Sequence, residues 1–258
     1  YHQIYQMLLE PEQEEHFDQL MELLDKNWGE FLAVESRAMY KYAQNYCIRQ
    51  LKLGNSRFWQ ESFSLFSKLL DNGLLLDEGH IAPTDFQNVC NVAIRLGKHL
   101  WAKEFLTTYG QKIPSAHQTN VLSFCRANLL SAQGKASEAI RLLQEVQFTD
   151  VSYQITARQM LLKLYLDQQD WDSALYHIDA FSIFTRRNKM LTKMDKKGQL
   201  AYLRMARKIV LLAEKSDKLS LVKRETEAQK IRESLLSIHP LNQRQWLIQR
   251  LDSLIESD

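Results

Sequence analysis

Apolar side chains recur at helical spacing along most of the chain, and no segment alternates between apolar and polar residues over a useful length. Phe17, Leu20, Leu23 and Leu24, for example, follow the spacing that places side chains on one face of a helix. Pro11 precedes them and suits the first position of their helix. The sequence therefore predicts an all-α protein. The helices are expected over residues 12–27, 30–53, 58–70, 84–96, 101–109, 118–133, 137–146, 151–168, 171–184, 199–215, 219–238 and 246–255.

A turn followed by an alanine recurs three times at nearly constant spacing. The turns begin at Gly97, Gly134 and Gln169, which lie 37 and 35 residues apart. A period in this range is typical of stacked helical hairpins. Gly54 begins a fourth, degenerate hairpin, in which Trp59 takes the place of the alanine, so packing there must differ. The alanines that follow the three turns are Ala102, Ala139 and Ala174.

This frame resembles the tetratricopeptide repeat, whose second helix starts with a small residue that lets neighbouring hairpins approach closely. The three alanines match that position, and Gly97 and Gly134 match the turn glycine, whereas Gln169 departs from it. The resemblance covers about residues 84–184 and, less closely, 36–72. It implies a right-handed superhelical stack of antiparallel helical hairpins, an α-solenoid. Ala139 is then expected where two hairpins pack.

The whole chain is also similar to a family of uncharacterised bacterial helical-repeat proteins. That likeness supports the same fold and implies no activity. The short segments that carry it are Asn45-Tyr46-Cys47-Ile48, Trp101-Ala102, Arg186-Arg187 and Arg244-Gln245-Trp246-Leu247.

Three segments are expected along the chain. Residues 1–80 form degenerate hairpins, residues 81–184 form three repeat-like hairpins, and residues 185–258 form a basic connector followed by capping helices. The last helix carries an apolar stripe that includes Trp246 and is only about ten residues long, which is marginal alone in water. We therefore expect it to dock on the preceding helices near Leu203 or Leu235 and to close the end of the solenoid.

A partner-binding surface is predicted on the first helices of the hairpins. In tetratricopeptide-like arrays these helices line a concave face that holds extended peptides or helices. Amide side chains on that face can hydrogen-bond a peptide backbone. The alternative interpretation is that they are merely polar groups on a solvent-facing side. The predicted partner-binding residues are Gln87, Asn91, Arg95, Asn128, Gln159 and Lys163.

Charge is unevenly distributed, although the net charge is only +2. Residues 1–40 hold nine acids and two bases, whereas residues 186–233 hold fifteen bases and six acids. The basic connector is the best nucleic-acid candidate. Its aromatic stacking partners are limited to Phe184 and Tyr202, and no named binding motif accompanies it, so nucleic-acid binding is the alternative and not the leading hypothesis. The residues of this candidate site are Arg186, Arg187, Lys189, Lys193, Lys196 and Lys197.

No motif for catalysis or for a cofactor accompanies these patterns. Cys47, Cys90 and Cys125 form no Cys-x-x-Cys pair, and no histidine lies in a metal-ligand motif. Neither a glycine-rich phosphate loop nor a Gly-x-Ser-x-Gly elbow occurs, and no run approaches the ~20 apolar residues of a membrane span. We expect a cytoplasmic, non-enzymatic scaffold that binds a protein or peptide and uses no cofactor or metal.

Overall fold

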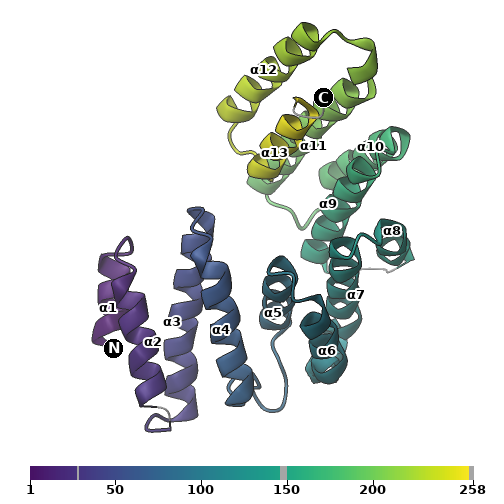
Figure 1. Cartoon of the computed structure of the whole chain (residues 1–258). Coiled ribbons are helices and arrows are strands. Elements are labelled where there is room, and N and C mark those ends of the chain that lie inside the picture. Colours follow the sequence, from purple (N-terminus) through teal and green to yellow (C-terminus); the bar gives the residue numbers. More distant parts are fainter. Residues whose placement is uncertain (28, 146–149, 256–258) are drawn as a thin grey trace. The chain divides into compact units, whose positions relative to one another are not determined.

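The computed structural model describes residues 1–27, 29–145 and 150–255. These residues form thirteen α-helices and two short 3-10 helices and contain no strand, which confirms the predicted all-α class (Figure 1). The chain divides into two compact units, Tyr1–Gln147 (unit 1) and Phe148–Asp258 (unit 2). The boundary between the units lies inside the segment that carries the three repeat turns.

Unit 1 consists of helices that pack on their neighbours in the chain. The helices are α1 His2–Leu9, α2 Glu15–Lys26, α3 Ala33–Lys52, α4 Arg57–Asp71, α5 Pro83–Arg95, α6 His99–Tyr109, α7 Ser115–Ala132 and α8 Ala136–Glu145, with a 3-10 turn at Gly110–Lys112. α1, α2 and α3 contact one another, α4 packs between α3 and α5, and α5, α6 and α7 form a second group with α8 on α7. Val146, the predicted end of α8, lies outside the described residues.

The N-terminal region differs from the prediction in two respects. α2 begins four residues after Pro11, so the expected start of this helix at the proline is wrong. The Pro11 carbonyl instead accepts hydrogen bonds from the side chains of Tyr46 and Gln50, at 2.9 and 2.7 Å. The additional helix α1 buries Ile4 and Met7. With so few core positions, its apolar period is too short to be recognised from the sequence.

The repeat turns share one backbone conformation. Gly97 and Gly134 have φ values of 71° and 76°, and Gln169 adopts the same left-handed region with a φ of 56°. A glycine suits this region because an L side chain crowds the following carbonyl there. The three alanines that follow these turns are fully buried at 0% exposure. The turn-plus-alanine pattern therefore marks real helix junctions and real core positions.

Unit 2 contains the remaining helices. They are α9 Val151–Asp167, α10 Trp171–Arg187, α11 Lys193–Glu214, α12 Leu221–Ser237 and α13 Arg244–Ile255, with a 3-10 turn at Ser216–Lys218. α10 packs on both α9 and α11, while α11, α12 and α13 contact one another. Leu203 of α11 and Leu235 of α12 are buried, as are Leu247 and Leu251 of α13. The prediction that the last helix docks on the two helices before it is confirmed.

The basic segment predicted as a connector is in large part helical, which corrects that prediction. α11 begins at Lys193, six residues earlier than expected. Thr192 and Asp195 form a capping box, in which each side chain accepts from the backbone N–H of the other residue. Gly198 lies inside the helix, where an added Cβ would come within 2.6 Å of the Asn242 side-chain oxygen. This glycine serves a close approach and does not break the helix.

Candidate binding groove

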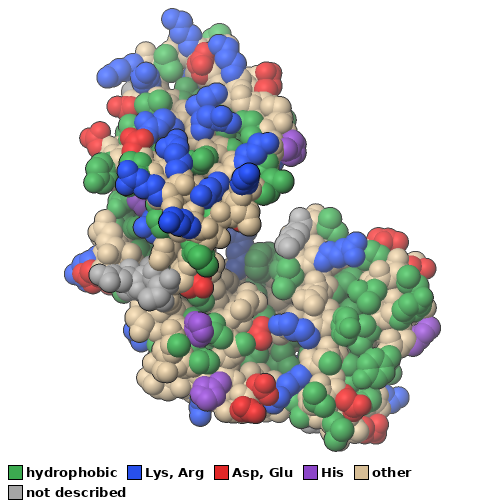
Figure 2. Space-filling view, turned by 180° about the vertical axis from the view of Figure 1, so that it is seen from behind, with side chains coloured by type: hydrophobic (Ala, Val, Ile, Leu, Met, Phe, Trp, Pro, Cys, Tyr) green, Lys and Arg blue, Asp and Glu red, His purple; other side chains and the backbone are tan. Residues whose placement is uncertain are grey.

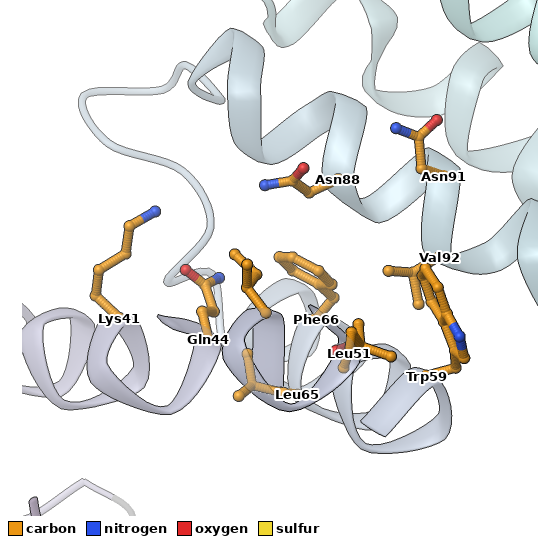
Figure 3. Close-up of a pocket in the computed structure, with 11 residues that line it drawn as sticks. Lys41, Gln44, Leu51, Trp59, Leu65, Phe66, Asn88, Asn91 and Val92 are labelled. Carbon is orange, nitrogen blue, oxygen red and sulfur yellow. The ribbon is translucent and has the colours of Figure 1, made fainter. Parts of the chain in front are cut away.

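A groove runs between α3, α4 and α5 of unit 1 (Figure 3). Its principal cavity has a volume of about 370 Å³. The walls are mostly apolar and include Leu51 of α3, Leu65 and Phe66 of α4, and Val92 of α5. A few polar side chains lie among them. An apolar cavity with a small number of convergent polar groups is typical of ligand-binding sites.

Trp59 is a large side chain in the wall of this space. It occupies the place that a small residue takes in the other repeats, and its indole lines the cavity. The equivalent alanines are fully buried, which requires neighbouring helices to approach closely. An indole does not fit at the same helix separation, because protein interiors leave no spare volume. The Arg95 guanidinium of α5 lies over the Trp59 ring, 5.7 Å from its centroid.

Gln44 is a largely buried residue whose amide lies in the wall of the groove. The residue is only 7% exposed, and its side chain has no hydrogen-bond partner among the described residues. Figure 3 shows the amide directed from α3 into the cavity. A primary amide offers donors and an acceptor. Neither amide atom of Gln44 is among the fully buried atoms without a partner in the described residues, so the amide is accessible from the cavity. A ligand in the cavity can therefore reach it and supply its missing partners.

Two asparagines of α5 lie across the cavity from Gln44 (Figure 3). The amide of Asn88 has no partner among the residues that the structure describes. The Oδ1 atom of Asn91 accepts a hydrogen bond from Asn128 Nδ2 at 2.8 Å, which leaves the Nδ2 donor of Asn91 available. The groove therefore presents three neutral amides beside an apolar surface.

The groove continues past Gln44 into a second cavity of about 370 Å³. Lys41 and Gln44 line both cavities, and the second one extends along α3 to Arg37. Lys41 forms an ion pair with Asp85 of α5 at 3.0 Å, and Arg37 pairs with Asp77. The charged side chains of this region are thus neutralised within the protein.

The predicted partner-binding residues of unit 1 lie at or next to the groove. Asn91 lines it, Asn128 holds Asn91 from α7, and Arg95 stacks on Trp59. Gln87 lies one helical turn before Asn91, half-buried, and does not line the cavity.

The two predicted residues of unit 2 are engaged by the end of the chain. Gln159 is buried, donates a hydrogen bond to Gln199 at 2.8 Å and accepts one from Gln243 at 3.1 Å. Lys163 donates to Gln243 at 3.1 Å, and its ammonium lies 5.1 Å from the centroid of the Trp246 ring. Burial lowers the pKa of Lys163, although the nearby Asp167 carboxylate opposes this shift. These side chains join α9 to the segment that leads into α13.

The residues of the nucleic-acid alternative lie on two helices and the link between them. Arg186 and Arg187 end α10, and Lys189 follows in the link. The lysines at 193, 196 and 197 belong to the first turns of α11.

The chemistry next to the groove is that of neutral groups. Cys47 lies beside Ser62, and burial raises the pKa of its thiol to about 12, so the thiol stays protonated at neutral pH.

In the described ranges, no cluster of three or more His, Cys, Asp or Glu residues is placed to hold a metal ion. Within the same ranges, no helix has both the length and the apolar character that a bilayer crossing requires.

No family model, curated protein or solved structure matches this chain.

Gln44 and Asn88 are not predicted from the sequence, because a single amide on an amphipathic helix carries no recognisable signal. Trp59 does carry a signal in the sequence, because a large side chain at a position that is small in the other repeats indicates different packing there.

Proposed function

We propose that this protein is a non-catalytic interaction protein that binds an extended, uncharged peptide segment of a protein partner in the groove between α3, α4 and α5. The observation that carries the proposal is the unpaired Gln44 amide, which lines the groove and has no partner in the described part of the protein. A bound backbone can donate to this amide and accept from it.

The amides favour an extended segment over a helix as the occupant. A helix satisfies its backbone N–H and C=O groups internally, whereas an extended peptide presents them to its surroundings. Gln44, Asn88 and Asn91 offer both donors and acceptors to such a backbone. Apolar side chains of the peptide would lie against Leu65 and Phe66. Because the Lys41 ammonium already pairs with the Asp85 carboxylate, it does not favour a strongly charged ligand.

The length of the groove suits a short linear segment. Its two cavities are lined from Arg37 to Leu51 of α3. At 1.5 Å per helical residue this span is about 20 Å long. An extended chain rises by about 3.3 Å per residue, so about six residues of a partner would fill the groove.

The proposed architecture is a right-handed solenoid of helical hairpins in a reducing, cytoplasmic compartment. Asn91 and Asn128 occupy equivalent repeat positions, and they hydrogen-bond directly at 2.8 Å. Equivalent positions on successive first helices become neighbours when repeats stack, so this bond supports stacking of α5 on α7. The three cysteines are free and buried, which supports the reducing compartment.

Selection from a random peptide library displayed on phage tests the binding proposal. The full chain is the bait, and the affinity of enriched peptides is then measured by fluorescence anisotropy. We expect enriched peptides to carry apolar residues and to bind the Gln44→Met variant at least about tenfold more weakly, a change of about 1.4 kcal/mol. Methionine preserves the volume of the side chain and removes its hydrogen bonds.

Gln133→Met is the matched control, because Gln133 is exposed at the end of α7. It should leave peptide affinity unchanged. The proposal would be overturned if no peptide were enriched, or if both variants bound the peptides equally well. Turnover of a substrate at a rate abolished by one polar substitution would overturn the non-catalytic part.

A further inference from the structure

A group of cations at the end of α10 and along α11 lacks carboxylate partners. Arg207 pairs with Asp179, and Lys196 donates to the Arg186 carbonyl at 3.2 Å. No other cation between residues 186 and 208 forms an ion pair with any residue in the described ranges. We call these unpaired residues the α10–α11 basic surface. They are Arg186, Arg187, Lys189, Lys193, Lys197, Arg204 and Lys208.

The acidic end of the chain behaves differently. Arg57 of α4 pairs with Glu14, Asp18 and Glu61, and Lys68 pairs with Asp25. Arg57 and Lys68 therefore offset two of the seven excess negative charges of residues 1–40 inside unit 1. The residues of the α10–α11 basic surface, by contrast, form no ion pair within the described ranges.

The basic surface surrounds a cleft between α10 and α11. The cleft has a volume of about 480 Å³, and Arg186, Lys197, Arg204 and Arg207 line it together with Ser182. Figure 2 shows the Lys and Arg side chains gathered densely on one face of unit 2. Positive groups that converge on a cleft focus its potential and attract anions.

The same cations form a stripe along one side of α11. At 100° per residue, Lys193, Lys197, Arg204 and Lys208 fall within about 60° of one another around the helix axis. They span about 22 Å along the axis at 1.5 Å per residue. All four side chains are exposed. A linear polyanion could contact every one of them at once.

We propose that the α10–α11 basic surface binds the phosphodiester backbone of double-stranded nucleic acid without reading its bases. This goes beyond the peptide-binding function and concerns a different unit. Guanidinium and ammonium groups are the donors that contact phosphates, and interfaces with DNA are far more positively charged than interfaces between proteins. The cores of protein–protein interfaces are instead depleted of charged residues.

The aromatic residues of this region favour a duplex over a single strand. Single-stranded nucleic acid is held by bases that stack on exposed aromatic rings. Tyr202 is fully buried at 0% exposure. Phe184 is half-buried, and the Arg158 guanidinium lies 4.0 Å from its ring centroid. Neither ring is open for stacking, so the cations are the groups of this surface that would hold a nucleic acid.

The test measures the salt dependence of duplex binding by the full chain. A fluorescein-labelled DNA duplex of about 20 base pairs and an RNA duplex of the same sequence are titrated by anisotropy between about 50 and 200 mM salt. We expect both to bind, with a log–log slope of about −0.9 per phosphate contacted in the DNA. The triple variant Arg186→Gln, Lys197→Gln, Arg204→Gln should reduce the steepness of the DNA slope by up to about 2.7 and weaken binding at least about tenfold.

The matched control removes the same amount of charge from unit 1, through Lys26→Gln, Lys103→Gln and Lys112→Gln. These three lysines are exposed and have no carboxylate partner in the described part of the chain. The control should keep the slope and affinity of the parent. A charge-conserving triple variant, R186K, K197R and R204K, should also keep the slope, because lysine and arginine both remain cationic at neutral pH.

Four results would overturn the proposal. They are the absence of duplex binding at the lowest salt, an equal loss in the two glutamine triples, tighter binding of a single strand than of the duplex, and equal binding of poly-glutamate. The last result would identify the surface as a site for an acidic protein segment. Because the peptide groove lies in unit 1, peptide affinity serves as an independent readout that the unit 2 variants should leave unchanged.

Discussion

Gln44 and Gln50 lie six residues apart on α3, are 7% and 5% exposed, and differ in that only Gln50 has a hydrogen-bond partner among the described residues. Gln50 donates its amide to the Pro11 carbonyl at 2.7 Å, which ties α3 to the turn before α2. Gln44 faces the groove and donates to nothing in the described protein. The two residues therefore allow one substitution to separate a binding role from a structural role.

Methionine at the two positions should affect stability differently. Gln44→Met replaces an unpaired amide that is accessible from the cavity, so it should change the free energy of unfolding by less than about 0.5 kcal/mol. Gln50→Met removes one of the two donors to the Pro11 carbonyl, which keeps its hydrogen bond from Tyr46, and should lower the free energy of unfolding by about 0.5–1.5 kcal/mol. Urea unfolding followed by circular dichroism measures both changes. Destabilisation by Gln44→Met equal to that of Gln50→Met would show that Gln44 has a structural partner, and the binding proposal would lose its main support.

The repeat turns give a second prediction with an internal control. Gln169 has a φ of 56° where Gly134, at the same repeat position, has a φ of 76°. The left-handed conformation costs a non-glycine residue about 1–2 kcal/mol, and the added chain entropy of glycine cancels part of any gain. Gln169→Gly should therefore stabilise the protein by about 0.5–1 kcal/mol, and Gly134→Ala should destabilise it by about 1 kcal/mol. Thermal melts of the two variants check the signs. A lower melting temperature for Gln169→Gly would contradict the strain argument.

The pattern of the sequence predicts most of the helices because apolar spacing and turn glycines are local signals. Ala102, Ala139 and Ala174 are placed correctly in the core for the same reason. Gly198 explains the error at the start of α11, since a glycine that permits close approach of Asn242 looks like a helix breaker when only the sequence is read. Local spacing cannot distinguish the two roles.

The residues of the candidate site depend on contacts that the sequence does not encode locally. Lys163 is predicted on an open face, yet Gln243, 80 residues later, bonds to it. Nothing in the spacing of α9 indicates that partner. Trp59 is recognisable as a departure from the repeat, but the groove that it lines is also lined by Gln44 and Asn88, which come from two other helices.

Ala139 provides a test of tight packing in the repeat region. It is fully buried, as expected, but its helix α8 packs mainly on α7 of the same hairpin and not on a neighbouring hairpin as predicted. Ala139→Leu should force these helices apart and cost about 1–3 kcal/mol. Ala116→Leu is the control, because Ala116 is exposed on α7. An unchanged melting temperature for Ala139→Leu would mean that the position tolerates a large side chain and that the small residue has no packing role.

His177 predicts how the stability of unit 2 responds to pH. Burial lowers its pKa from the ordinary 6.5, the Arg158 charge acts in the same direction, and the 2.8 Å hydrogen bond between His177 Nε2 and the Arg158 carbonyl partly opposes the shift. The unfolded chain then binds a proton more readily than the native protein as pH falls through 6.5. This residue therefore contributes full stability above that pH and loses its contribution below it.

Urea unfolding at pH values of about 7.5 and 5.5 measures this effect. The parent should be less stable at the lower pH, and His177→Gln should show a smaller loss, because glutamine can still donate to the Arg158 carbonyl but does not titrate. Equal pH dependence in the two proteins would exclude His177 as the source.

Trp246 gives the last prediction, which concerns the helix at the end of the chain. Its ring centroid lies 6.1 Å from that of Tyr202 in α11 and 5.1 Å from the Lys163 ammonium of α9, while Leu247 and Leu251 beside it are fully buried. An isolated helix of this length is marginal in water, so docking holds it. Trp246→Ala should cost about 2–3 kcal/mol, somewhat less than for a fully buried large-to-small change.

Deletion of residues 241–258 should cost more than Trp246→Ala and should promote self-association, because it exposes the apolar surface of α11 and α12 that α13 covers. Denaturation midpoints and analytical ultracentrifugation measure the two effects, and Trp246→Phe, which retains a ring, serves as the mild control. If the deletion left both stability and monodispersity unchanged, α13 would not be a cap. Trp246 would then become a candidate anchor for a partner, since tryptophan is enriched among the residues that dominate binding energy at interfaces.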